Sequence, residues 1–312
     1  INTALGLNSM HDAFSVAIIS MMLISAVLSL LGIALIKERH IPETTKEDKV
    51  KVTDIFGMIK TNGALRIRLA DMLFTGFIWN FLFATATYYA KWAYCTDLTT
   101  GAVDTAKLGT FTMVSSLLMF FPLIIGTLVG SPIMKAIGSP IRFHRILILL
   151  EFVPGGILFV LQMVGLLQSL PAVYLLCMGV CACAIGMDYI PGEVINIEAM
   201  DYEIYKNGKD RSALCNAANK FLGKAQSAVA SGLVGVILVA VGYEVDSATD
   251  TFLGELSSIP VMLDWFIVIM GLIPFFLGLV GWLVLKRYPI TDEIRADMHE
   301  KLSGTSHAAG NT

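Results

Sequence analysis

The chain alternates long apolar stretches with shorter polar segments. Seven stretches hold about 20 or more residues with few charges, and a hydrocarbon layer about 30 Å thick is crossed by roughly 20 helical residues. The pattern therefore predicts seven transmembrane helices, at about 13–36, 69–90, 108–129, 146–166, 172–195, 213–241 and 261–285. The first stretch is too long for a signal-peptide core and follows His11 and Asp12 rather than Lys or Arg, so we expect it to span the membrane too.

The composition agrees with a membrane protein and excludes other classes. The 312 residues are 55% hydrophobic and 15% charged, with a mean hydropathy of +0.71, whereas soluble domains carry about a quarter charged residues. A disordered chain, a collagen-like repeat and an ordinary cytosolic enzyme are thereby excluded. The five cysteines have no disulfide or zinc spacing, and His-Glu-x-x-His and Gly-x-Ser-x-Gly motifs are absent. We therefore expect no enzymatic activity, metal site, cofactor or nucleic-acid partner, and a monomer in the lipid bilayer.

Basic residues lie on one side of the predicted spans. Nineteen of the 22 Lys and Arg fall in the segments 37–68, 130–145, 196–220 and 286–312. Loop 243–260, on the other side, carries only acidic charges. Because basic residues accumulate in cytoplasmic segments, the N-terminus is predicted to lie outside a plasma (inner) membrane and the C-terminal tail inside it.

The segment 37–68 is the longest of the basic connectors. After a run of charges at 43–49 it becomes amphipathic, with apolar residues at Val52, Ile55, Phe56 and Ile59. Asn62 and Gly63 follow as a stop signal. We expect a short helix lying on the inner membrane surface, at a boundary between two halves of the protein.

A polar stripe runs along the sixth predicted span. Lys224 lies about eleven residues into this span, roughly 16 Å along a helix and too deep to reach the interface easily. At about 100° per residue, small and polar side chains share an arc of about 140°: Asn216, Asn219, Lys220, Gly223, Lys224, Ser227 and Ser231. The stripe favours a water-accessible cavity. The alternative is an interface of small residues, with Lys220 reaching the membrane surface and Lys224 paired to a carboxylate.

Four carboxylates lie in the inner halves of other spans: Asp71, Glu151, Asp188 and Glu193. Ionisable groups in the membrane cost on the order of a few kcal/mol each, and their position favours structural or gating ion pairs over substrate contacts. Pro154-Gly155-Gly156 and Pro191-Gly192 lie close by and would allow bending or local unwinding.

Aromatic and amide side chains follow the outer half of the second span. Tyr89 and Trp92 are expected in an interfacial aromatic belt. Asn80 is deep enough to be an inward-facing hydrogen-bonding group, and Trp79 beside it would stack on a ligand ring if it were turned inward.

The most specific sequence lies in the third basic segment, where residues 198–211 read EAMDYEIYKNGKDR and Phe221-Leu-Gly-Lys224 follows. The run of acidic-x-x-Asp-Tyr-acidic, Lys-x-Gly, a basic cluster and a lysine-bearing helix resembles the glycoside–pentoside–hexuronide:cation symporters of the major facilitator superfamily. The Lys60-Thr-Asn62-Gly63 segment and the Tyr288-Pro289 tail resemble the same family.

The resemblance implies an all-α fold of twelve spans in two six-helix bundles. The seven spans correspond to the sixth through the twelfth, so five further N-terminal spans are expected in the complete protein. The implied divisions are a last helix of the N-terminal bundle at 1–36, a cytoplasmic central loop at 37–68, a complete C-terminal bundle at 69–285 and a cytoplasmic tail at 286–312. The cation site is expected in the N-terminal bundle.

The resemblance also implies a function, which is symport of a sugar or glycoside with Na⁺ or H⁺ by alternating access. Lys224 corresponds to a family lysine near the cation and sugar sites, and Asn219 to a sugar-facing position. Inner-side ion pairs are expected among Glu198, Asp201, Glu203, Lys209 and Arg211. A seven-span receptor or a retinal protein is the alternative. A retinal protein would carry its lysine in the seventh span, whereas the deep lysine here is in the sixth.

Overall fold

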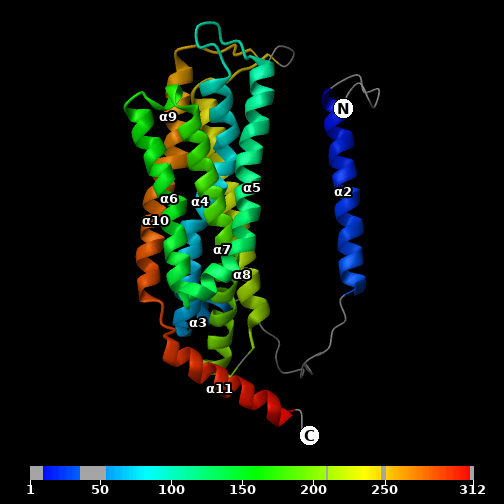
Figure 1. Ribbon diagram of the computed structural model, residues 1–312, viewed down its shortest axis with the longest axis vertical. Helices are drawn as coiled ribbons and strands as arrows, with labels where there is room; N and C mark the ends of the chain where they lie inside the picture. Colours follow the sequence, from blue (N-terminus) through cyan, green and yellow to red (C-terminus); the bar gives the residue numbers. More distant parts are fainter. Residues whose placement is uncertain (1–9, 36–53, 209, 247–250, 310–312) are drawn as a thin grey trace. The chain divides into compact units, whose positions relative to one another are not determined.

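The computed structural model describes residues 10–35, 54–208, 210–246 and 251–309 (Figure 1). The chain divides into two units, residues 1–49 and 50–312. Among its described residues, the first unit contains one helix, α2 (Met10–Leu35), and nearly all of the described side chains of α2 are exposed. A helix with an apolar surface on every side is typical of a transmembrane segment.

The second unit is a helical bundle. Its long helices are α4 (Gly63–Tyr94), α5 (Thr105–Ile137), α6 (Pro140–Met163), α7 (Pro171–Asn207) and α8 (Ser212–Ala240). A last span combines α9 (Ser258–Ile267), a π-helical turn (Val268–Leu272), α10 (Ile273–Val284) and a 3-10 turn (Leu285–Arg287). The short helices are α3 (Asp54–Thr61), a 3-10 turn (Leu167–Ser169) and the tail helix α11 (Asp292–Ala309). In the described part of the chain, seven helical segments are long and apolar enough to cross a membrane, so the predicted spans and all-α membrane fold are confirmed.

The helices extend beyond the apolar stretches that predicted them. Asn62 ends α3 and caps α4, its side chain accepting a hydrogen bond from the Leu65 amide at 2.9 Å, so 63–68 belong to α4 rather than to the connector. Likewise α7 runs to Asn207 and ends at Gly208, whose φ of +62° favours glycine. The acidic motif that begins at Glu198 is therefore helical. Apolarity marks the part of a helix that faces lipid, whereas caps mark where it ends.

Helices α5 and α7 pack closely along a seam of glycines. Gly126 and Gly130 of α5 lie against the backbone at Cys183 and Met187 of α7, and Gly186 of α7 lies against Leu123 of α5. Small residues let two helix backbones approach in a membrane, where dispersion contacts replace the hydrophobic effect. Helices α6 and α7 continue as α-helices through Pro154 and Pro191.

The glycine seam gives a direct prediction for Gly130→Ala. A Cβ there would lie 2.9 Å from the Met187 carbonyl oxygen, a backbone atom that cannot rotate away. The free energy of unfolding should fall by about 1–3 kcal/mol. Gly232→Ala on α8 is the matched control, because a Cβ there meets nothing within 4 Å. It should leave stability unchanged or raise it by up to about 1 kcal/mol. Equal losses in both variants would show that the seam is not tight.

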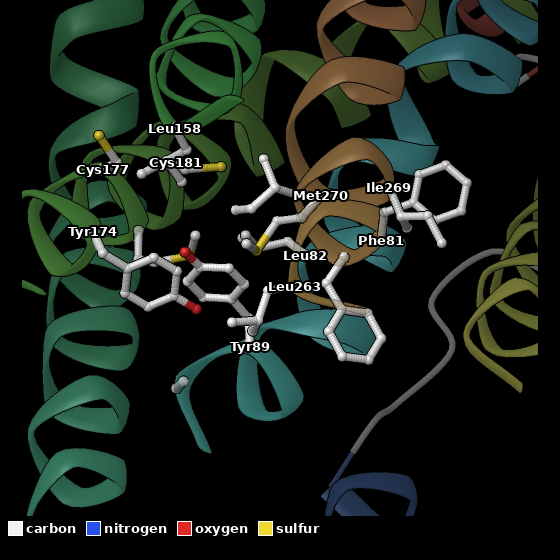
Figure 2. Close-up of a cluster of buried hydrophobic side chains, with 14 of the residues drawn as sticks. Phe81, Leu82, Tyr89, Leu158, Tyr174, Cys177, Cys181, Leu263, Ile269 and Met270 are labelled. Atoms are coloured by element: carbon white, nitrogen blue, oxygen red, sulfur yellow. The ribbon is translucent and has the colours of Figure 1, made fainter. Parts of the chain in front are cut away.

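The hydrophobic core is formed mainly by α4, α6, α7 and the span that begins with α9, and α5 and α8 add further residues. Tyr89 and Tyr174 stack with ring centroids 5.4 Å apart, and Met270 and Leu263 lie beside them (Figure 2). Tyr89 and Trp92 are both fully buried, so the predicted interfacial belt is wrong for them. Trp92 is instead covered by Phe252 of the loop that precedes α9.

Candidate functional site

Helix α8 is attached to the bundle along one side. The buried residues on that side are Cys215, Gln226, Ala230, Val234 and Ile237. The Gln226 side chain donates hydrogen bonds to the backbone carbonyls of Met72 and Leu73 in α4, at 2.7 and 3.0 Å. These bonds satisfy a polar group inside the membrane and fix the rotation of α8 about its axis.

The polar stripe lies next to this buried side of α8 and overlaps its edge. Asn216, Lys220, Lys224 and Ser227 are all exposed, and Asn219 is half-buried beside them. Within the described residues, neither lysine forms an ion pair. A Cβ placed on Gly223 would meet nothing within 4 Å. No described helix of the second unit therefore packs on this face at Gly223, in contrast to an interface of small residues.

Asn219 adds an unsatisfied acceptor to this face. Its Oδ1 atom is buried and has no hydrogen-bond partner in the described part of the chain. Buried side-chain acceptors are normally bonded to protein or water. The amide oxygen is therefore an unsatisfied acceptor, which a donor reaches only if the side chain or its neighbours move.

Trp79 and Asn80 of α4 interact within their own helix. The Asn80 side chain donates to the Gly76 carbonyl at 2.8 Å. The Trp79 ring lies against Phe83, with centroids 3.9 Å apart. Both side chains are half-buried. In this conformation the tryptophan is held by an aromatic neighbour, and stacking on a ligand would require it to turn.

A buried charge network connects α4, α6 and α7. The Arg68 guanidinium pairs with the Asp71 carboxylate at 2.5 Å and its Nε donates to the Asn196 side chain at 2.8 Å. The His144 ring lies between two carboxylates, with Nε2 at 3.0 Å from Asp71 and Nδ1 paired with Asp188. Asp71 is fully buried and Arg68 is 7% exposed. Three helices are thereby joined by ionic contacts that water screens little.

The sequence indicated only part of this network. The sequence predicts ion pairs for Asp71 and Asp188, but it places Arg68 in a connector and indicates no role for His144. The available signal was a carboxylate in the second predicted span that needs a cation, with His144 two residues before the fourth predicted span. Glu151, also buried, and the exposed Glu193 form no ion pair within the residues described.

The end of the bundle near α11 holds a second group of contacts. Glu198 of α7 pairs with Arg295 of α11 at 2.6 Å. Glu203 accepts from Arg211 at 3.4 Å and from the Asn207 side chain at 3.0 Å.

Two further residues were expected in the same group. Asp201 is half-buried and forms no salt bridge among the described residues. Lys209 lies outside the described residues.

A small apolar cluster stabilises the same end. Its members come from α3, α4, α7, α8 and the tail: Met58, Ala64, Leu65, Ala199, Tyr202, Cys215, Ile290 and Met298. The predicted amphipathic segment thus packs one side of α3 on the bundle, while Phe56 is 76% exposed. The helix ends that carry the acidic motif are held together by apolar packing as well as by charge.

The contacts of α11 predict how its docking to the bundle depends on pH. Asp297 accepts from the Tyr205 hydroxyl at 2.6 Å and pairs with Lys301 at 2.9 Å. The hydroxyl first, and then the lysine, hold the pKa of Asp297 below its ordinary value of 3.8. Since the folded pKa is depressed, this carboxylate supports docking above about pH 4, and the support is lost as the pH falls through the folded pKa.

Hydrogen exchange of the α11 amides should therefore be pH-independent, after correction for the intrinsic rate, between about pH 5 and 8 and should accelerate below about pH 4. The Asp297→Asn variant is the control. It removes the titrating group, so the acceleration of exchange below about pH 4 should be smaller in this variant. Acceleration of exchange near neutral pH in the unaltered protein would contradict this assignment.

The fold and this site define a class of membrane protein. The described chain has seven apolar spans, one of which carries a polar face with two lysines, and ionic contacts join other spans. This arrangement is typical of multi-pass transporters. The sequence model of the family described as MFS/sugar transport protein matches residues 4–292. The chain belongs to this family of membrane transporters. Searches of curated proteins and of solved structures gave no match.

Proposed function

We propose that the protein is a cation-coupled symporter of a sugar or glycoside, of the glycoside–pentoside–hexuronide:cation type, and that it works by alternating access. The observation that carries the proposal is the exposed face of α8, where two lysines and two amide or hydroxyl side chains lie along a membrane span. Charges at such depth are costly unless they face water or a partner. The family assignment to sugar transport supports the same conclusion.

The chemistry of this face suits a neutral polyol. Sugars offer many hydroxyl groups, which act as both donors and acceptors. Lys220 and Lys224 supply ammonium donors, Ser227 a hydroxyl, and Asn219 a free amide oxygen. We assign direct sugar contacts to this set. Lys224, the deepest charge, also balances carboxylates of the coupling-cation site when Na⁺ or H⁺ is absent.

The network of Arg68, Asp71, His144 and Asp188 has a different role in this proposal. Arg68, Asp71 and His144 are buried between helices of one bundle and Asp188 is half-buried, so together they keep α4, α6 and α7 as a rigid body. Alternating access moves whole bundles around a central site. The contacts of Glu198 and Glu203 lie at the end predicted to be cytoplasmic, where they would stabilise the state closed on that side.

Uptake by the complete protein in proteoliposomes tests the proposal. A panel of radiolabelled mono- and disaccharides is supplied with an inward Na⁺ gradient, an inward proton gradient or neither. Accumulation of at least one sugar above its external concentration, with only one of the gradients, is the expected result. If the sugar only equilibrated across the membrane, with or without either gradient, sugar transport would not be coupled to a cation. Binding of a sugar without any movement across the membrane would favour a receptor.

A further inference from the structure

A groove between the start of α4 and the end of α10 is lined by basic and apolar residues only. Its volume is about 600 Å³, and its lining includes Arg66, Lys286 and Arg287 beside Val280, Leu283 and Val284. The three basic side chains are exposed. The groove lies at the α11 end of the bundle, because Arg287 directly precedes the segment that leads into α11 (Figure 1).

The cations of this groove lack anionic partners. Among the described residues, none of the three forms an ion pair with a carboxylate. Lys286 lies 4.3 Å from the centroid of the Trp282 ring, and Arg145 lies 4.7 Å from the same ring. The Nε atom of Arg145 is buried without a hydrogen-bond partner in the part of the chain described. Two cations on one ring repel each other, so an anion nearby would lower their energy.

We propose that this groove binds an anionic phospholipid. The phosphate lies among Arg66, Lys286 and Arg287, and an acyl chain lies along Val280, Leu283 and Val284. Charge complementarity selects the headgroup, and the apolar wall selects a lipid over a free anion. The groove opens beside transmembrane helices, where a membrane supplies this ligand at high local concentration. The proposal does not depend on what the protein transports.

Binding of phosphatidylglycerol and of phosphatidylcholine with the same acyl chains tests this site. The complete protein in detergent is titrated with each lipid, and bound lipid is counted by native mass spectrometry. Phosphatidylglycerol should bind at least about tenfold more tightly. A basic residue near an anionic headgroup contributes about fivefold, so each of the single variants Arg66→Gln, Lys286→Gln and Arg287→Gln should reduce the preference by about that factor, and the triple variant should abolish it.

A matched triple variant controls for general attraction between charges. Lys60, Lys135 and Lys206 are exposed basic residues of the same end that do not line the groove. Changing all three to Gln removes the same charge and should keep the preference for phosphatidylglycerol. An equal loss in both triple variants would overturn the proposal in favour of diffuse attraction. Displacement of the lipid by millimolar inorganic phosphate would overturn it in favour of a free-anion site.

Discussion

Replacing Lys224 with Gln is expected to abolish gradient-driven sugar accumulation by the complete protein. Lys224 lies on the exposed polar face of α8 and forms no ion pair among the described residues. Loss of a charged hydrogen bond costs about 1.5–3 kcal/mol, or roughly 10- to 100-fold in binding. Loss of the charge that balances the cation site should add to this. Initial rates of uptake with and without the gradient measure the effect.

Val229→Ala is the matched control for this variant. Val229 is 48% exposed on the same helix and carries no polar group, so its replacement should change uptake less than about twofold. Because Lys224 is exposed in the bundle, the Gln variant should fold and reach the membrane. Unchanged accumulation in a correctly folded Lys224→Gln protein would remove this residue from the proposed site.

Replacing Asp71 with Asn is expected to destabilise the fold more than the same change at Asp292 or Asp297. The substitution keeps the size of the side chain but leaves Arg68 and His144 without their shared acceptor charge. Breaking a buried ion pair by removing one partner typically costs about 3–5 kcal/mol. The free energy of unfolding in a mild detergent should fall by that amount.

Asp292→Asn supplies a closely matched comparison. Asp292 also pairs with an arginine three residues away, Arg295, at 2.6 Å, but its side chain is 76% exposed. An exposed pair contributes about 0–1 kcal/mol, so this change should have little effect. If the two variants lost equal stability, burial would not be what makes the Asp71 pair important. Normal stability of Asp71→Asn would show that the network does not join the helices.

Much of the fold can be predicted from the sequence because the lipid bilayer requires each span to be apolar over its whole thickness. Each span needs about 20 apolar residues, and all seven segments were located this way. The helix ends were missed by up to about a dozen residues, as at Asn207 of α7. There the charged residues continue the helix outside the predicted apolar stretch, and their hydropathy resembles that of a loop.

Some functional side chains could be predicted from the sequence, and others could not. The stripe of α8 was predictable because residues of one helix share a face by geometry alone, and the structure exposes that face. The bond between Arg68 and Asn196 joins residues 128 positions apart. No local pattern contains such a pairing, because it depends on how α4 and α7 pack. Trp92 was misplaced for a related reason, since a distant loop residue, Phe252, covers it.

Water access along α8 tests most directly whether its polar face lines an aqueous pathway through the membrane. Single cysteines are placed at Asn216, Lys224 and Ser227 of the polar face, and at Val229 and Val236 of the apolar surface, in a background without reactive native thiols. A charged, membrane-impermeant thiol reagent is applied to the complete protein from each side of the membrane. Reaction is expected at the three polar positions, slowed by a transported sugar, and no reaction is expected at the two valines. Equal reactivity in both sets, or none along the polar face, would contradict such a pathway.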